Sequence, residues 1–196
     1  MNLIDRAKKM ITVPKTEWLA VDAENSTPRS LLGSYVLPMA IISSLGILIM
    51  GLLYTGNWGL QYFILRTLIA FIAVPVSFYI ALYIVDMLAP GFDSEKNINK
   101  SAQLVAYSNT PAWIAGFLSF IPIIGFIILF AGWIYSIYLM YLGLGPLKKT
   151  PEDKKVLYMI VAFLVMLIIG FIVSYILGRL LLNSLGYGAY GGFNPW

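Results

Sequence analysis

The sequence contains no cysteine and no histidine among its 196 residues. Without cysteine there are no disulfides and no thiol nucleophiles, and without histidine there are no imidazole proton relays. The usual zinc and haem ligands are missing as well, so a bound metal ion would need oxygen ligands. A Ser-His-Asp triad is impossible in such a chain. These absences argue against an enzyme, and we expect no cofactor.

Charged residues are scarce as well. They make up 11% of the sequence, whereas soluble domains carry about 25%. Hydrophobic residues reach 60%, and the mean hydropathy is +0.83. This composition indicates an integral membrane protein. The lysines are divided among several loops and form no basic stripe interleaved with aromatic residues, so no nucleic-acid partner is expected.

Five apolar segments are long enough to cross the hydrocarbon of a bilayer, which takes roughly 17–25 residues for about 30 Å. The third of them is the shortest, and the turn that follows it is too apolar to leave the membrane far. The predicted fold is therefore all-α, a bundle of five transmembrane helices. The predicted spans are residues 31–53, 62–88, 103–120, 123–143 and 156–182.

Basic residues outside the spans predict the orientation, because Lys and Arg are enriched on the cytoplasmic side of membrane proteins. Five lie in residues 1–30, two in residues 89–102 and four in residues 144–155, so eleven of the thirteen share one side. Only Arg66 and Arg179 fall on the other side. The predicted topology has the N-terminus inside and the C-terminus outside.

The first residues, MNLIDRAKKMI, place apolar side chains at helical spacing with basic ones elsewhere on the wheel. This pattern predicts a short amphipathic interfacial helix on the inner leaflet, the alternative being a frayed tail. No signal peptide is recognisable, so we expect the first span to stay in the mature protein. The chain then divides into a cytoplasmic segment (1–30), a transmembrane domain (31–185) and an external Gly/Tyr-rich tail (186–196).

Residues 106–126, AYSNTPAWIAGFLSFIPIIGF, interrupt the third span with polar side chains and two prolines. Pro111 has no N–H to donate, and its ring disturbs the carbonyl of Tyr107. In lipid the freed carbonyl needs a donor, which the neighbouring polar residues can supply. Pro75 makes a similar break in the second span, and Pro122 lies in the turn of a helical hairpin. We therefore predict helix kinks at Pro75, Pro111 and Pro122.

Asp86 is the only acidic residue inside an apolar run, near the inner end of the second span. It can pair with Lys100, accept hydrogen bonds from Tyr107 or Asn109, contact a ligand or ion, or be solvated. Two more acidic residues follow in the next loop, but their spacing matches no calcium-binding loop and no metal site is expected. The candidate polar site consists of Asp86, Tyr107, Asn109 and Thr110.

Small residues recur at every fourth position in four of the spans, and the longest such ridge is Gly170–Ser174–Gly178. This spacing lets helix backbones approach closely in lipid. The ridges are explained either by packing within the bundle or by the face of a homodimer. The expected partners are membrane lipids, a second copy of the chain or other membrane proteins.

Several motifs together resemble the Yip1-domain family of five-span membrane proteins, in particular its short prokaryotic branch. They are PKTEW, VDMLAPGF, AYSNTPAWIAG with the following IP-x-x-G, WIYSIYLMYLGL and KTPEDKK. The resemblance implies five helices with a cytoplasmic N-terminus and an external C-terminus. In eukaryotes it implies vesicle trafficking with Rab-type GTPases as partners. For the prokaryotic branch it implies no established reaction, and it places the chain in a bacterial or archaeal plasma membrane.

Two functions remain open from the sequence. The first is a non-enzymatic membrane protein that organises proteins or lipids. The second is a transporter or channel for a small solute or ion, because proline-broken helices at matching depth are typical of transport sites. Its path would run between spans two and three, past the candidate polar site. Residues suited to acid–base catalysis are too few to favour a membrane enzyme.

Overall fold

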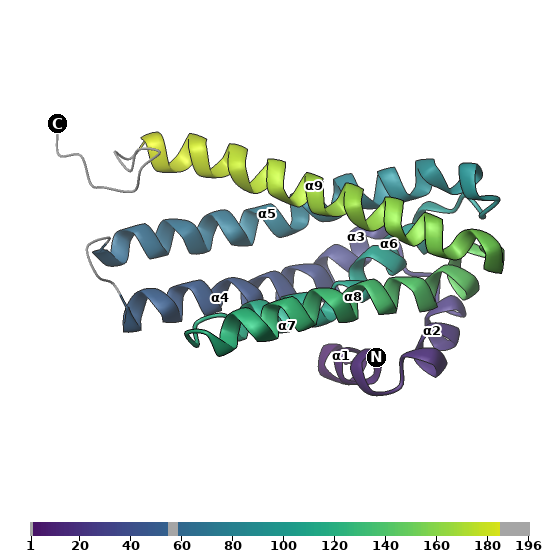
Figure 1. Cartoon of the computed structure of the whole chain (residues 1–196), viewed down its shortest axis with the longest axis horizontal. Helices are drawn as coiled ribbons and strands as arrows, with labels where there is room; N and C mark the ends of the chain where they lie inside the picture. Colours follow the sequence, from purple (N-terminus) through teal and green to yellow (C-terminus); the bar gives the residue numbers. More distant parts are fainter. Residues whose placement is uncertain (1, 55–58, 185–196) are drawn as a thin grey trace.

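The computed structural model describes residues 2–54 and 59–184, and all secondary structure in these ranges is helical (Figure 1). The long helices lie side by side along the long axis of the molecule, and the short helices α1 and α2 lie against the bundle. The predicted tail, residues 186–196, lies outside the described residues. In chain order the elements are α1 (Leu3–Thr12), α2 (Pro14–Asp22), α3 (Pro28–Leu31), η1 (Leu32–Val36), α4 (Leu37–Leu53), α5 (Gly59–Leu88), η3 (Ala89–Phe92), α6 (Ile98–Ser108), α7 (Thr110–Leu118), α8 (Ile124–Lys148) and α9 (Glu152–Ser184).

Four helical segments among the described residues are long and apolar enough to cross a membrane. They are Pro28–Leu53, Gly59–Phe92, Ile124–Lys148 and Glu152–Leu181, and they match the first, second, fourth and fifth predicted spans. Beyond the predicted fourth span, residues 123–143, α8 continues through Pro146 to Lys148. A proline removes only one hydrogen bond from the helix ladder, and the rest of α8 is retained around it.

The third predicted span, residues 103–120, is not one long helix. α6 ends at Ser108, and α7 begins at Thr110 with Pro111 in its first turn. Proline is accepted in a first turn, because its missing N–H has no intrahelical partner there. Pro111 therefore starts a helix. With 11 residues in α6 and 9 in α7, neither piece crosses a bilayer alone.

The other two prolines behave differently from each other. α5 runs through Pro75 as a single helix. Pro122 lies in the turn between α7 and α8, where its carbonyl accepts a hydrogen bond from Ile124 N at 2.7 Å and Ile123 adopts φ +64°. The predicted helical hairpin is present, with Pro122 at its tip between the two helices.

Buried side chains concentrate at one end of the bundle, which we call the packed end. It consists of α1, α2, α3, α6 and the adjoining ends of α5, α8 and α9, and Trp18, Leu104 and Tyr158 are fully buried there. Towards the opposite end, where α4 ends and α5 begins, many large apolar side chains of α4, α5, α8 and α9 are exposed. Exposed apolar faces of this kind are expected of helices surrounded by lipid.

The N-terminal helices belong to the packed end. Trp18 of α2 lies between α6 and α8, so close to Gly143 that a Cβ there would be 3.0 Å from the indole ring. The predicted helix at the N-terminus is present as α1, and it buries Arg6 and Met10 against the bundle. Ile4 and Ile11 are exposed, and their contact with the inner leaflet stays a prediction.

The small-residue ridges do not all serve the same purpose. A Cβ on Gly132 would lie 2.6 Å from Ala115 Cβ, so this ridge packs α8 against α7 inside the bundle. A Cβ on Gly170 or Gly178 would meet no atom within 4 Å. The ridge on α9 therefore has open space beside it at both glycines.

Candidate functional site

An ion pair is buried at the packed end between α5, α6 and α8. Lys148 Nζ lies 3.1 Å from Asp86 Oδ1 and donates to Ser101 Oγ at 2.7 Å. Ser101 Oγ in turn donates to Asp86 Oδ1 at 2.9 Å, and the carbonyl of Asn97 lies 3.5 Å from the ammonium. Lys148 and Ser101 are fully buried, and Asp86 is 6% exposed. A buried ammonium group needs this number of acceptors, because it has lost its water.

The end of α8 determines the position of Lys148. The next residue, Lys149, adopts φ +52°, which ends the helix, and the carbonyl of Lys148 accepts a hydrogen bond from Glu95 N at 2.7 Å. Ser94 Oγ donates to Thr150 Oγ1 at 2.9 Å. The segments that follow α5 and α8 are thus joined beside the ion pair.

Asp86 binds Lys148 and Ser101, and not Lys100 or Asn109, which the sequence offered as partners. Lys100 lies 3.1 Å from Asp22, and Asn109 donates to the carbonyl of Val105 at 2.8 Å. Lys148 was not predicted as a partner of Asp86, because it was counted among the loop lysines. A usable signal exists in the sequence, since Asp86 and Lys148 both lie near span ends that the lysine distribution predicts to share one side of the membrane.

The helix break between α6 and α7 is closed by hydroxyl groups. Thr110 Oγ1 donates to the carbonyl of Tyr107 at 2.7 Å, which supplies the donor that this carbonyl needs beside Pro111. Tyr35 OH lies 2.6 Å from Thr110 Oγ1. A threonine hydroxyl has one proton, so Tyr35 is the donor in that bond. Tyr35 lies on η1, a π-helical turn just before Pro38.

The ring of Tyr107 lies beneath a buried cation. The guanidinium of Arg6 is 5.2 Å from the ring centroid, and it also binds Glu17 at 2.6 Å and Glu24. Cation–π contacts strengthen when the cation is desolvated, and Arg6 is nearly fully buried. These contacts attach α1 and α2 to α6 at the packed end.

Asp22 makes a second, more exposed connection at the same end. Its carboxylate lies 3.1 Å from both Lys100 Nζ and Lys149 Nζ. Burial by itself would raise the pKa of Asp22, but the hydrogen bonds and charges of the two lysines outweigh it and hold the pKa below its ordinary value of 3.8. The C-terminal end of α2 is thus tied to α6 and to the end of α8.

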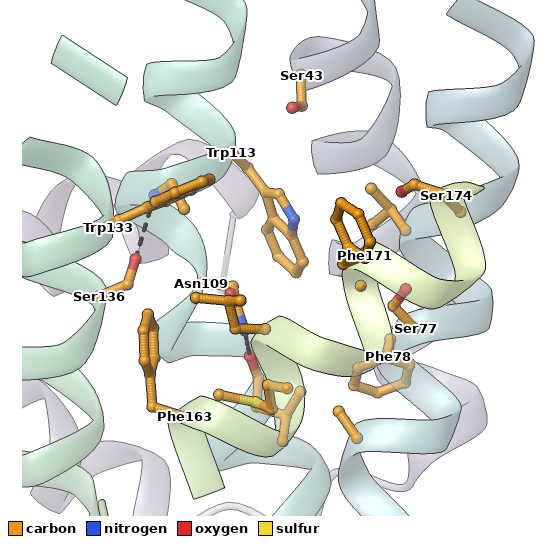
Figure 2. A pocket seen from close by; sticks show the side chains of 18 of the residues that line it. Ser43, Ser77, Phe78, Asn109, Trp113, Trp133, Ser136, Phe163, Phe171 and Ser174 are labelled. Atoms are coloured by element: carbon orange, nitrogen blue, oxygen red, sulfur yellow. Dashed lines mark hydrogen bonds between the residues drawn. The ribbon is translucent and has the colours of Figure 1, made fainter. Parts of the chain in front are cut away.

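Asn109 has a different environment from the other predicted site residues. It lines a cavity of about 520 Å³ bordered by α4, α5, α6, α7, α8 and α9. Figure 2 shows the side chains of Trp113, Trp133 and Phe171 around the same space. Asp86, Tyr107 and Thr110 do not line it. The four predicted residues therefore occupy three settings, namely the ion pair, the closed helix break and the cavity.

The charges at the packed end are arranged to hold helices together. Within residues 2–54 and 59–184, no three acidic side chains gather as they would around a metal ion. The buried carboxylates of Asp86 and Glu17 each face a cation at hydrogen-bonding distance. This arrangement can fix the relative positions of α1, α2, α5, α6 and α8.

The fold and the composition define an all-helical integral membrane protein. The sequence matches the Yip1 domain over residues 8–174, and the chain belongs to that family. The matched range contains the buried ion pair, the break at Pro111 and the cavity. No curated protein and no solved structure matches the chain.

Proposed function

We propose that this Yip1-domain protein is a non-enzymatic membrane scaffold that organises proteins or lipids. The main observation in support of this proposal is the buried ion pair of Asp86 and Lys148. An acid inside a membrane domain that serves transport faces a pathway or a substrate. Here the carboxylate is bound by Lys148 and Ser101 and enclosed by packed side chains, which supports a structural role.

The proposal includes a topology. The packed end lies in the cytoplasm, the chain crosses five times with α6 and α7 forming one crossing, and the C-terminus is outside. The lysine distribution supports this orientation, because the lysines in α1, at the C-terminal end of α8 and at the N-terminal end of α9 all lie at the packed end. The membrane is the plasma membrane of a bacterium or archaeon, as the resemblance to the short branch of the family implies.

Single cysteines test the topology, because the chain has none of its own. Lys8→Cys and Lys154→Cys should react with a membrane-impermeant maleimide only from the cytoplasmic side. Tyr54→Cys should react only from outside. Labelling of the first two positions from opposite sides of the membrane would contradict the proposed topology.

Reconstituted vesicles test the scaffold role. We expect cross-linking in vesicles to capture a second copy or a partner protein, or the purified protein to retain lipid. A strictly monomeric protein that binds neither lipid nor protein would refute the proposal.

The transporter is kept as a second candidate, because the cavity reaches Asn109. Vesicles that contain the protein should leak ions and small solutes no faster than protein-free vesicles. Flux that Asn109→Ala or Asp86→Asn reduces would favour transport over the scaffold.

A further inference from the structure

The cavity beside Asn109 is an elongated slot that runs along the bundle. On α5 its lining extends from Ala70 to Ala81, and on α9 from Phe163 to Ser174. Each stretch is about 16 Å long at 1.5 Å per residue. The hydrocarbon of one leaflet is about 15 Å thick, half of the bilayer value. Both stretches are centred on the middles of the predicted second and fifth spans, residues 62–88 and 156–182, so the slot lies across the middle of the bilayer and measures about half the thickness of its hydrocarbon.

The walls of the slot are mostly apolar, and their polar side chains come from four serines and Asn109. Trp133 of α8 and Phe171 of α9 line the slot and are 46% and 70% exposed, so the slot opens to the surroundings of the bundle beside them. Figure 2 shows both rings bordering the space from different helices. A mostly apolar opening between membrane-spanning helices favours hydrocarbon over water.

Small residues create the space. Ala70, Ala73 and Ser77 line the slot on α5, and Gly170 and Ser174 line it on α9. A Cβ on Gly170 would meet no atom within 4 Å, so this glycine is not used for close helix packing. The small side chains instead leave room between α5 and α9 that no described side chain fills.

Asn109 supplies a polar group in this apolar slot. One of its Nδ2 protons is used in the bond to Val105 O. A carboxamide has a second N–H and two acceptor lone pairs, and no described residue bonds them. Asn109 lies at the break between α6 and α7, so this polar group faces the slot from within the third crossing.

We propose that the slot binds one hydrocarbon chain of a bilayer phospholipid, which enters between α8 and α9. The inference deepens the proposed function, because it names the lipid class that the scaffold would hold.

Photo-cross-linking tests the slot in the full-length protein. The protein is reconstituted into vesicles of phosphatidylethanolamine and phosphatidylglycerol that contain a phospholipid with a mid-chain diazirine. Adducts are mapped by mass spectrometry on Trp113, inside the slot, and on Phe130, an exposed residue outside it. Gly170→Phe fills the slot, and Gly178→Phe is the matched control because Gly178 has the same open space but does not line the slot.

We expect Gly170→Phe to lower the Trp113 adducts by about fivefold or more, because the phenyl group would occupy the room of the lipid chain and overfilling a packed space is unfavourable. The Phe130 adducts should stay constant, and Gly178→Phe should behave as the unmodified protein. Ser174→Phe serves as a second filling variant if Gly170→Phe does not fold. Unchanged Trp113 adducts in a folded filling variant would overturn the proposal. A monomeric, partner-free protein that still gave Trp113 adducts would contradict protein organisation and leave the lipid slot intact.

Discussion

Replacement of Lys148 by methionine is the most direct test of the buried ion pair. The substitution keeps an unbranched side chain in the packed end and removes the ammonium. Asp86 is then left buried with Ser101 as its remaining described partner. Removal of one partner from a buried pair costs about 3–5 kcal/mol. In a protein of this length such a loss lowers the melting temperature by about 6–20 °C.

A second substitution, made in the same protein, shows whether the loss of stability comes from the unpaired charge of Asp86. Asp86→Asn in the Lys148→Met background removes the unpaired charge, so the double variant should be more stable than Lys148→Met alone. Lys154→Met is the control, because Lys154 and its partner Asp93 are 36% and 64% exposed. An exposed pair of this kind is worth less than about 1 kcal/mol.

The assay is the unfolding of each variant in mild detergent, followed by circular dichroism against denaturant and temperature. The reasoning is refuted if Lys148→Met and Lys154→Met lose the same stability. It is also refuted if the second substitution in the double variant adds a further loss to the first. Either result would mean that the pair is solvated and does not hold α5 to α8.

Three further predictions use the same unfolding assay. Gly46→Ala should destabilise the protein by about 1–3 kcal/mol, because its Cβ would lie 2.5 Å from two backbone carbonyl oxygens of α7. Gly178→Ala should be neutral or stabilise the protein by up to about 1 kcal/mol. Equal effects of the two substitutions would contradict the close packing of α4 against α7. Thr110→Val should cost about 1–3 kcal/mol, since it leaves a buried carbonyl without its donor, and an unchanged melting temperature would exclude this role. Because the pKa of Asp22 is lowered in the folded state, Asp22 should stabilise the protein fully above about pH 5 and lose that contribution as the pH falls below 3.8. Asp22→Asn should remove this part of the acid dependence. An identical acid profile in the variant would show that the pair with Lys100 does not contribute.

The sequence predicted the membrane class and the position of the long helices, because hydropathy and helix length are properties of contiguous residues. It also predicted the break at Pro111, since the missing N–H of a proline acts on its own turn whatever surrounds it. The Yip1 resemblance rested on the same local motifs. Where each helix ends was not predicted, and α8 continues through Pro146 to Lys148.

Only the tertiary structure decided which distant groups meet. Asp86 and Lys148 are 62 residues apart in the chain, and the four predicted polar residues were separated into three environments. The burial of Trp18 and Arg6 in the packed end, and the slot beside Gly170, likewise depend on how the helices are placed against one another. Local sequence fixes which segments form helices in lipid. The contacts between helices depend on side-chain packing across many segments at once, which no single stretch of the chain encodes.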